Sequence, residues 1–444
     1  MSSNDYVTKP LDSDASGKTA KPKTNVRWRM FVVLLLVGTL SYIDRISLSI
    51  GMPLISKEFS LSPEIQGVLL SCFFWTYAAF QVPAGMMADR KGPRWLLTIA
   101  VSLWSVFQLF TGLAANLVMM IAARMGLGAA EAAQYPSGGK LSALWLPEKD
   151  RARGAVLMDS SSTLGAAVGS LIVAGLITLL GGWRESFIAV AIVTAAAGFV
   201  VHKYIRDTPR EHPKADETEV AYIEAAHAEE DAKDGALTTS KRSSIGFLRF
   251  KTFWFMGIGF LSANMLFYGL LTFGPLYLFQ ERGLDIKGLA GASFAIYFAG
   301  FVGENVAGWI AQKWRRSGAR ANLVMRTLLG ISALIATAAI FCVAFVQDAT
   351  VAIILLGVTL FFLRFLGLYW SLPGTLTVRS RAGVLGGMMN LFSNVGGIAI
   401  PIVIGLIVGA TGSYFIGLMV FAGCGLSYLI CSLCINYEKK LPLA

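Results

Sequence analysis

The chain has 444 residues, of which 55% are hydrophobic and 15% are charged, and its formal net charge is +11. About a quarter of the residues of an average soluble domain are charged, so this composition excludes a soluble enzyme and a disordered scaffold. We therefore predict an all-α polytopic membrane protein, in which twelve spans of about 20 residues would account for the apolar residues.

Apolar segments, read in chain order, predict twelve membrane-spanning helices. The first six cover residues 30–54, 64–87, 95–115, 117–138, 154–179 and 183–204. The last six cover residues 252–279, 287–311, 322–346, 349–374, 384–409 and 413–436. A long polar stretch separates the two sets, so the chain is expected to consist of two six-helix halves.

The Lys and Arg residues predict which side of the membrane the termini occupy. An even number of spans places both termini on one side, where 30 of the 38 basic residues lie, against four in the opposite loops. Basic residues gather in cytoplasmic loops. We therefore expect cytoplasmic termini in a plasma membrane, or inner membrane in a bacterium, and no nucleic-acid partner.

The polar segments divide the chain into five expected parts. They are a disordered tail (1–29), a first half (30–204), a cytoplasmic linker (205–246), a second half (247–437) and a short tail (438–444). Within the linker, the spacing of Val220, Ile223 and Ala226 predicts a short amphipathic helix on the cytoplasmic face.

Similar short patterns recur at matching places in the two halves. Gly85-x-x-Ala-Asp-Arg follows the second span, and Gly308-x-x-Ala-Gln-Lys follows the eighth. Duplicated halves with a site between them near the membrane midplane are typical of secondary transporters.

Seven ionisable residues inside the predicted spans need partners or a wet cavity. A charge at the bilayer centre costs about 2.5–3.5 kcal/mol or more. The seven are Asp44, Arg45, Arg124, Glu131, Asp159, Glu304 and Arg364. Arg45 is the first candidate to bind an anionic substrate, because a guanidinium matches a carboxylate with two parallel hydrogen bonds. Glu131 lies two turns after Arg124 on one helix face, so an approaching arginine could release a proton from it.

Asp159 and Arg364 allow two interpretations. Arg364 either binds the far end of a dicarboxylate or pairs structurally with Glu304 or Asp159. Asp159 can hydrogen-bond substrate hydroxyls, but it should repel a second carboxylate unless Arg364 or a proton offsets its charge. Neutral groups for binding substrate hydroxyls, or for packing against the substrate, are expected from Ser162, Asn264, Tyr268, Trp370, Asn390 and Asn394.

Motifs for other kinds of protein are missing from the sequence. It contains no HExxH, GxSxG or P-loop pattern and no Cys or His set that would bind a metal. We expect neither enzymatic activity nor a cofactor or metal.

The segment from Gly85 to Arg94, GMMADRKGPR, closely resembles the loop signature of the major facilitator superfamily. The resemblance narrows to its anion:cation symporter family, near the sugar-acid proton symporters. It rests on Tyr42-Ile-Asp44-Arg45, Trp75-Thr-Tyr77, Arg124-x6-Glu131 and Asn390-x3-Asn394-x2-Gly397-x3-Pro401. The resemblance implies the major facilitator fold, with twelve helices in two pseudo-symmetric halves.

The resemblance also implies roles for individual residues. Arg45 and Tyr77 would bind substrate, Asp44 and Glu131 would carry the coupled proton, and Arg124 would tune these acids. A conformational motif at the loop would comprise Gly85, Asp89, Arg90, Gly92 and Arg94.

We expect a monomeric carrier that takes up a small organic anion, a sugar acid or a related carboxylate, by proton symport with alternating access. One alternative is another anion, such as an aromatic carboxylate, a sulfonate or phosphate, with sodium coupling or exchange. A more distant alternative is a membrane receptor that binds an anion without transporting it.

Overall fold

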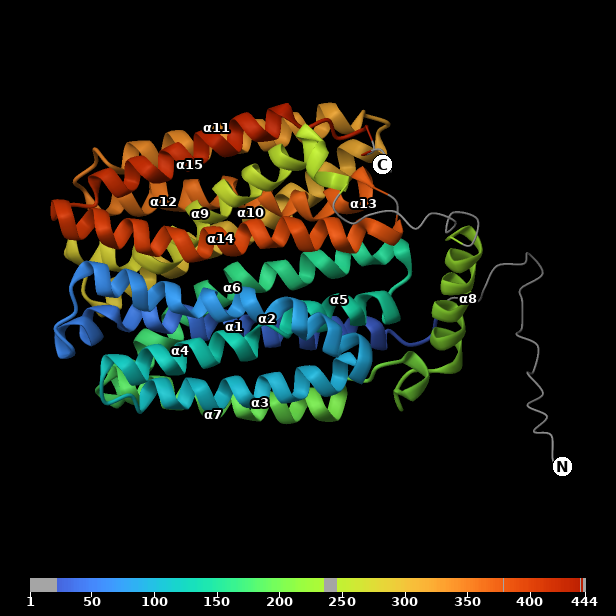
Figure 1. Ribbon diagram of the computed structural model, residues 1–444, viewed down its shortest axis with the longest axis horizontal. Coiled ribbons are helices and arrows are strands. Elements are labelled where there is room, and N and C mark those ends of the chain that lie inside the picture. Colours follow the sequence, from blue (N-terminus) through green and yellow to red (C-terminus); the bar gives the residue numbers. More distant parts are fainter. Residues whose placement is uncertain (1–21, 235–245, 378, 440, 442–444) are drawn as a thin grey trace.

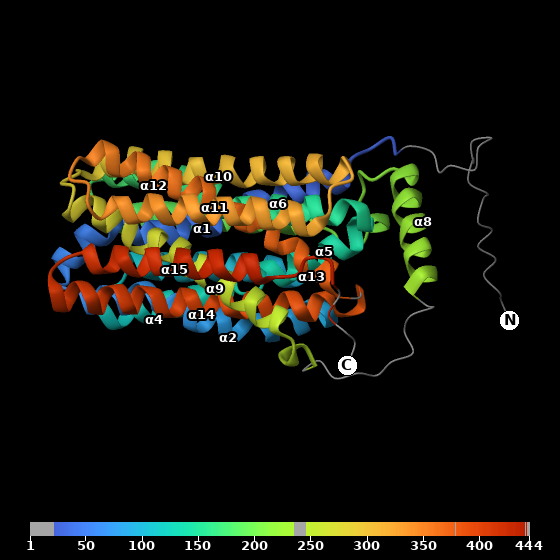
Figure 2. The same ribbon diagram turned by 90° about the horizontal axis from the view of Figure 1, so that it is seen from above.

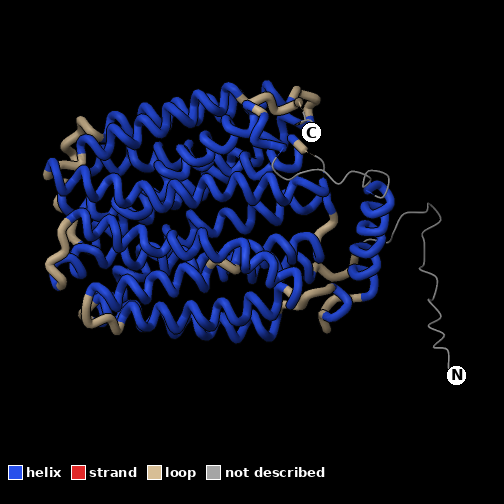
Figure 3. Tube along the Cα trace, in the orientation of Figure 1, coloured by secondary structure: helices blue, strands red, loops and turns tan. Residues whose placement is uncertain are grey.

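The computed structural model describes residues 22–234, 246–377, 379–439 and 441. These residues form helices joined by short loops, and no strand occurs among them (Figure 3). The long helices run side by side along one axis, so the all-helical prediction is confirmed (Figures 1 and 2).

Seven helices make the first half of the bundle. They are α1 (Val26–Glu58), α2 (Pro63–Lys91), α3 (Pro93–Gly112), α4 (Leu117–Glu131), α5 (Gln134–Trp145), α6 (Glu148–Leu180) and α7 (Trp183–Tyr204). Pro63 and Pro93 stand at helix starts, where the missing N–H costs nothing. Gly92 and Gly181, with φ of 88° and 87°, end α2 and α6 in a conformation that favours glycine.

The linker and the second half follow. The linker contains η1 (Pro209–Glu211), α8 (Glu217–Asp234) and η2 (Gly246–Arg249). The second half contains α9 (Lys251–Gln280), α10 (Ile286–Arg316), α11 (Ala321–Val343), α12 (Ala349–Leu363), η3 (Arg364–Ser371), α13 (Leu372–Leu376), α14 (Arg379–Thr411) and α15 (Phe415–Cys434).

Two of the predicted spans are interrupted. Eleven helical segments of the described chain are long and apolar enough to cross a membrane. The predicted fourth span, 117–138, is divided into α4 and α5 at Ala132 and Ala133. Pro136, in the first turn of α5, has no N–H that could bond back to Ala132 across this break. The predicted tenth span, 349–374, changes from α-helix to 3₁₀-helix over η3, just before Pro373. Counting each interrupted span once gives twelve crossings, as predicted.

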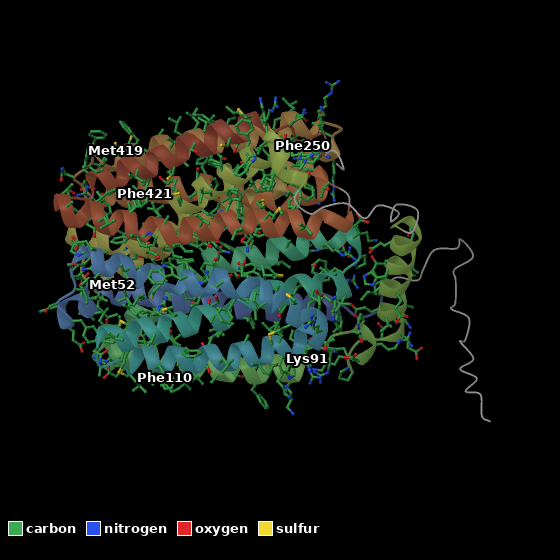
Figure 4. The ribbon with its side chains drawn as sticks, in the orientation of Figure 1. Met52, Lys91, Phe110, Phe250, Met419 and Phe421 are labelled. Carbon is green, nitrogen blue, oxygen red and sulfur yellow. The ribbon has the colours of Figure 1, made fainter. Side chains whose placement is uncertain are left out.

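The two halves pack against each other mainly along two helix pairs, α2 with α14 and α6 with α10, and α1 also contacts α9. In Figure 1 the first half lies below the second, and α6 and α14 run between them. Large apolar side chains cover the outer faces: Phe110 is 49% exposed and Leu179 is 82% exposed (Figure 4). Such a surface suits lipid and not water, so the chain is a multi-pass membrane protein.

Helix α8 lies across the end of the bundle where α1 begins and α15 ends (Figures 1 and 2). Its buried Glu219 accepts hydrogen bonds from the backbone N–H groups of Val26 (2.9 Å) and Arg27 (3.1 Å) and pairs with the Arg27 side chain. Glu230 accepts one from the backbone N–H of Glu148 (2.6 Å), the first residue of α6. Two carboxylates of α8 therefore cap the starts of two long helices.

These contacts change one expected boundary and qualify the expected packing of the linker helix. The tail was expected to end at residue 29, but α1 begins at Val26 because Glu219 caps it there; residues 1–21 lie outside the described residues. The predicted apolar face of the linker helix is represented mainly by Ile223, which is 1% exposed. The helix packs on the first half through its carboxylates as well as through that face.

The helices α2 and α14 meet closely at the end of the bundle remote from α8. A Cβ atom added to Gly67 would lie 2.5 Å from the carbonyl oxygen of Pro401, and one added to Gly405 would lie 2.7 Å from that of Pro63. The Ser71 hydroxyl also donates to the carbonyl oxygen of Ile398 (2.8 Å). The two halves are therefore in backbone contact at this end.

Candidate functional site

A cavity lies between the two halves. Its walls come from α1, α2, α5 and α6 of the first half and from α9, η3 and α14 of the second. The described lining residues are Tyr42, Tyr77, Tyr135, Asp159, Phe260, Asn264, Phe267, Tyr268, Arg364, Leu366, Trp370, Asn390, Ser393 and Asn394. Eight of the ten residues predicted to bind substrate lie in this set; Arg45 and Ser162 do not.

Arg45 lies directly behind one wall of the cavity. Its guanidinium carbon is 4.6 Å from the ring centre of Tyr42 and 4.7 Å from that of Tyr77, and both tyrosines line the cavity. Its Nη2 is 3.0 Å from Oε2 of Glu131, and its Nε is 3.1 Å from the same oxygen. The predicted substrate-binding arginine and a predicted proton-carrying acid thus form a buried ion pair.

Two further charged residues of the first half, Asp44 and Arg124, and the hydroxyl of Ser41 lie around this pair. The Ser41 hydroxyl donates to Oε2 of Glu131 at 2.6 Å, and Arg124 donates to the backbone carbonyl of Asp44 at 3.2 Å. Within the described residues, neither carboxyl oxygen of Asp44 has a hydrogen-bond partner, nor does Oε1 of Glu131. Two buried carboxyls with unpartnered oxygens therefore share their surroundings with two arginines.

A second charged cluster joins the two halves at the cavity. Nη2 of Arg364 is 2.7 Å from Oδ2 of Asp159 and 2.7 Å from Oε2 of Glu304, and Nε is 3.2 Å from that glutamate oxygen. Asp159 belongs to α6, whereas Arg364 and Glu304 belong to the second half. Of the two interpretations of Arg364, the structure shows the pairing, and it also places Arg364 in the cavity wall.

Amide side chains tie α2 to α14 beside the cavity. Oε1 of Gln81 accepts hydrogen bonds from Nδ2 of Asn390 (2.9 Å) and of Asn394 (3.1 Å). Asn264 donates to the carbonyl of Phe260 in its own helix (2.8 Å). Ser162 is 1% exposed and lies outside the cavity wall.

Sequence reasoning missed the amide of Gln81 and six described residues of the wall: Tyr42, Tyr135, Phe260, Phe267, Leu366 and Ser393. Tyr42 stands within the quoted helix 1 motif, three residues before Arg45, which is the spacing of one helix face. Tyr135 follows Glu131 by four residues, but the break between α4 and α5 decides where its ring points. Gln81 carried no signal beyond being a polar residue in an apolar span.

The loop motif makes its described contacts with the first half and with the adjoining linker. Oδ1 of Asp89 pairs with Nζ of Lys140 of α5 (2.8 Å), and each of these two side chains is more than one third exposed. The backbone N–H of Arg94 donates to Asp207 (2.8 Å), and that carboxylate fills the space beside Gly92. A Cβ added to Gly85 would meet nothing closer than 3.9 Å.

Comparison with known proteins identifies relatives over nearly the whole chain. The sequence matches the family model of the Major Facilitator Superfamily over residues 34–401. It is 30% identical to the "Probable sulfoacetate transporter SauU" of Cupriavidus necator, over 90% of this chain and 91% of that protein. It is 29% identical to the "Probable galactarate/D-glucarate transporter GudP" of Bacillus subtilis, over 94% of each.

Two further comparisons agree. A "Probable L-galactonate transporter" of Escherichia coli is 29% identical over 94% of this chain and 90% of its own length. The crystal structure of a bacterial homologue of the human lysosomal transporter Spinster, inward-facing and occupied, superposes with a TM-score of 0.70 at 19% identity. That match covers 92% of this chain and 96% of the other, and it shows a shared fold.

Proposed function

The chain belongs to the major facilitator superfamily and is a membrane transporter, and from this premise we propose that it takes up a small organic anion by proton symport. The anion is a sugar acid or a related carboxylate. The transporter works by alternating access, in which the two halves rock about the cavity between them.

The observation that carries the proposal is the ion pair between Arg45 and Glu131 behind the tyrosine wall. Glu131 occupies the same face of the guanidinium that a substrate carboxylate would use. A proton on Glu131 weakens this pair and frees Arg45 for the substrate. Loss of the proton restores the Glu131 carboxylate, which competes with the substrate for Arg45. Proton and anion binding then favour each other, as symport requires.

Asp44 and Arg124 complete this exchange in the proposal. Arg124 holds the backbone of Asp44, and the Asp44 carboxyl has no hydrogen bond within the described residues. A buried carboxyl without a donor is a place where a proton can reside while the substrate occupies Arg45.

The relatives support the proposed substrate class. Their names include galactarate, D-glucarate, L-galactonate and sulfoacetate, all small acids. Asn264, Asn390 and Asn394 line the cavity and offer hydrogen-bonding groups to sugar hydroxyls. Because sulfoacetate carries a sulfonate, a sulfonate is the second candidate anion.

Uptake into proteoliposomes tests the proposal. Radiolabelled galactarate, galactonate and sulfoacetate are offered with an inward proton gradient, without one, and with sodium replaced by choline. We expect accumulation of at least one probe only with the proton gradient and regardless of sodium. Equal uptake with and without the gradient would reject proton coupling, and dependence on sodium would support the alternative.

A further inference from the structure

The geometry at Arg364 points to a second anion subsite. We propose that Asp159, Arg364 and Glu304 select substrates with two acidic groups, and that the second acidic group replaces Asp159 on Arg364. This inference rests on the proposed transport of small organic acids and names a narrower class: dicarboxylates, or acids with one carboxylate and one sulfonate.

The cavity wall contains one cationic side chain among its described residues, Arg364, and one acidic side chain, Asp159. Arg364 is 3% exposed, so its charge is nearly removed from water and must be balanced by anions. An anion that reaches this part of the cavity therefore meets a guanidinium already held by a carboxylate.

The two carboxylates hold Arg364 in different ways. Glu304 contacts both Nε and Nη2, its side chain is 2% exposed, and it lies in the same half as the arginine. Asp159 contacts Nη2 alone, its side chain is 14% exposed, and it comes from the opposite half. Glu304 is thus a fixed support that orients the guanidinium, whereas Asp159 can be exchanged.

The exchange conserves charge at the arginine. When a substrate carboxylate or sulfonate takes the place of Asp159, Arg364 keeps two anionic partners, and no guanidinium charge is left unbalanced. The released Asp159 already faces the cavity, where a proton offsets its charge beside the incoming anion and water or a substrate hydroxyl can bind it. Nη1 of Arg364 has no hydrogen-bond partner among the described residues and remains available to the incoming anion.

A substrate with one acidic group gains nothing at this subsite. Its neutral end cannot replace a carboxylate on a buried guanidinium, and Asp159 stays in place. A substrate with two acidic groups can engage Arg45 in the first half and Arg364 in the second. It also releases the tie between the halves that Asp159 and Arg364 form, so binding frees the halves to move.

Matched pairs of probes test the proposal on the purified full chain. Galactarate and galactonate share a six-carbon chain and differ at one end, a carboxylate against a hydroxymethyl group. Sulfoacetate and acetate provide the same contrast in a two-carbon acid. The measured quantity is the ratio of the dissociation constants within each pair, obtained by calorimetry and checked by competition in the uptake assay.

The wild-type protein should prefer the doubly acidic member of a pair about tenfold or more, since a hydrogen-bonded charge pair contributes that much. In the double variant Arg364→Gln/Glu304→Gln, which leaves no buried glutamate charge unpaired, the preference should fall to within about threefold. Asp159→Asn removes the competing charge and should increase the preference several-fold. Arg326→Gln, whose arginine contacts the Ile435 carbonyl away from the cavity, is the control and should keep the wild-type ratio.

The outcomes separate this inference from the proposed function. The subsite is rejected, while organic-acid transport stands, if the wild-type protein binds both members of each probe pair equally well. It is also rejected if the double variant and Asp159→Asn give the same ratio of dissociation constants. If it neither binds nor transports any of the four probes, the proposed function fails and the subsite falls with it. Should the double variant fail to fold, Asp159→Asn decides alone, because an unchanged ratio there contradicts the exchange.

Discussion

Competition for one guanidinium is the central feature at the scale of single residues. Arg45 is 5% exposed and Glu131 is fully buried, and two hydrogen bonds join them. Removing one partner of such a pair leaves a buried charge without compensation. In the proposed mechanism the pair is therefore a switch between two occupied states of Arg45, held by Glu131 or held by a substrate anion.

Glu131→Gln is expected to separate exchange from accumulation. The amide cannot lose a proton, so the substrate still binds and exchanges, but an inward proton gradient no longer drives its accumulation. Counterflow and gradient-driven uptake, measured on the same proteoliposomes, check this. Glu224→Gln, at an exposed glutamate of α8 that pairs with Arg210, is the control; gradient-driven accumulation by Glu131→Gln would contradict the proton role.

Protonation of His212 is expected to loosen the linker. Burial, with help from Arg206, holds the pKa of His212 below its usual value near 6.5. Its ring packs edge-on against Trp145 and Tyr204, and its Nδ1 accepts a hydrogen bond from the backbone N–H of Lys214 (3.2 Å). A lowered pKa means that the folded linker prefers the neutral ring. The contribution of the neutral ring to the stability of the linker is therefore fully present above pH 6.5 and is lost as the pH falls through the lowered pKa.

Hydrogen exchange of residues 209–220 between pH 7.5 and 5.5 measures this effect. After correction for the intrinsic pH dependence of exchange, the wild-type linker should lose protection toward pH 5.5. His212→Asn should show the same protection at both ends of the range, and a wild-type linker with constant protection would contradict the prediction.

Sequence predicted which residues carry charge in the membrane and gave the pairing of Arg364 with Glu304 or Asp159 as one of two interpretations. It did not predict the pair of Glu131 with Arg45. The spacing of Arg124 and Glu131 put both on one helix face, yet Glu131 pairs with Arg45, 86 positions away. Arg364 and Asp159 are 205 positions apart. Such pairs depend on which helices pack against each other, and the spacing of residues within one helix does not encode this packing. The eight cavity residues were found because a polar side chain in an apolar span has few other reasons to be there.

At the scale of helices, the start and end of each element depend on single residues that sequence only partly reveals. Pro136 is visible in the sequence, but the predicted fourth span ran through it. The caps that Glu219 and Glu230 place on α1 and α6 come from 80 residues or more along the chain. For this reason the helix beginnings at Val26 and Glu148 fell outside the predicted spans.

Glu219→Gln is expected to destabilise the start of α1. The amide removes the charge that pairs with Arg27 and weakens the cap on two backbone N–H groups, at a cost of about 1–2 kcal/mol. Thermal melting in detergent should show a lower midpoint than in the control Glu224→Gln. Equal midpoints would mean that the cap contributes nothing.

Gly405→Ala is expected to separate α2 from α14 at the end remote from α8. The added methyl group would meet the backbone of Pro63, which cannot move as a side chain can. Spin labels on the remote ends of the two helices should report longer distances and a larger share of the conformation open at that end. Gly423→Ala, where an added Cβ meets nothing within 4 Å, should leave the distances unchanged.

At the scale of the whole molecule, hydropathy and charge along the chain were enough to predict the twelve crossings and their division into two sets of six. These properties follow from the thickness and polarity of the bilayer, which act on every segment separately. The relative placement of the halves depends on contacts between them, such as Gly67 with Gly405, and these have no signature in a single sequence.

The orientation of the molecule gives a further prediction. Because 30 of the 38 basic residues lie on the side of the termini, a fluorescent protein fused after Ala444 should fold in the cytoplasm and fluoresce. A phosphatase that is active only outside the cytoplasm should stay inactive at the same position. The opposite pair of results would overturn the proposed cytoplasmic termini.

The contact of Gly67 with Gly405 bears on how well the protein insulates the membrane. At this level backbone atoms of the two halves are in close contact at Gly67 and Gly405, and the Glu64 carboxylate of α2 lies against Gly409 of α14. The charged groups to which we assign proton and anion binding lie deeper, around Arg45 and Arg364. In the proposed proton-coupled cycle, this close backbone contact is the place where the carrier is closed at one end while its cavity opens at the other.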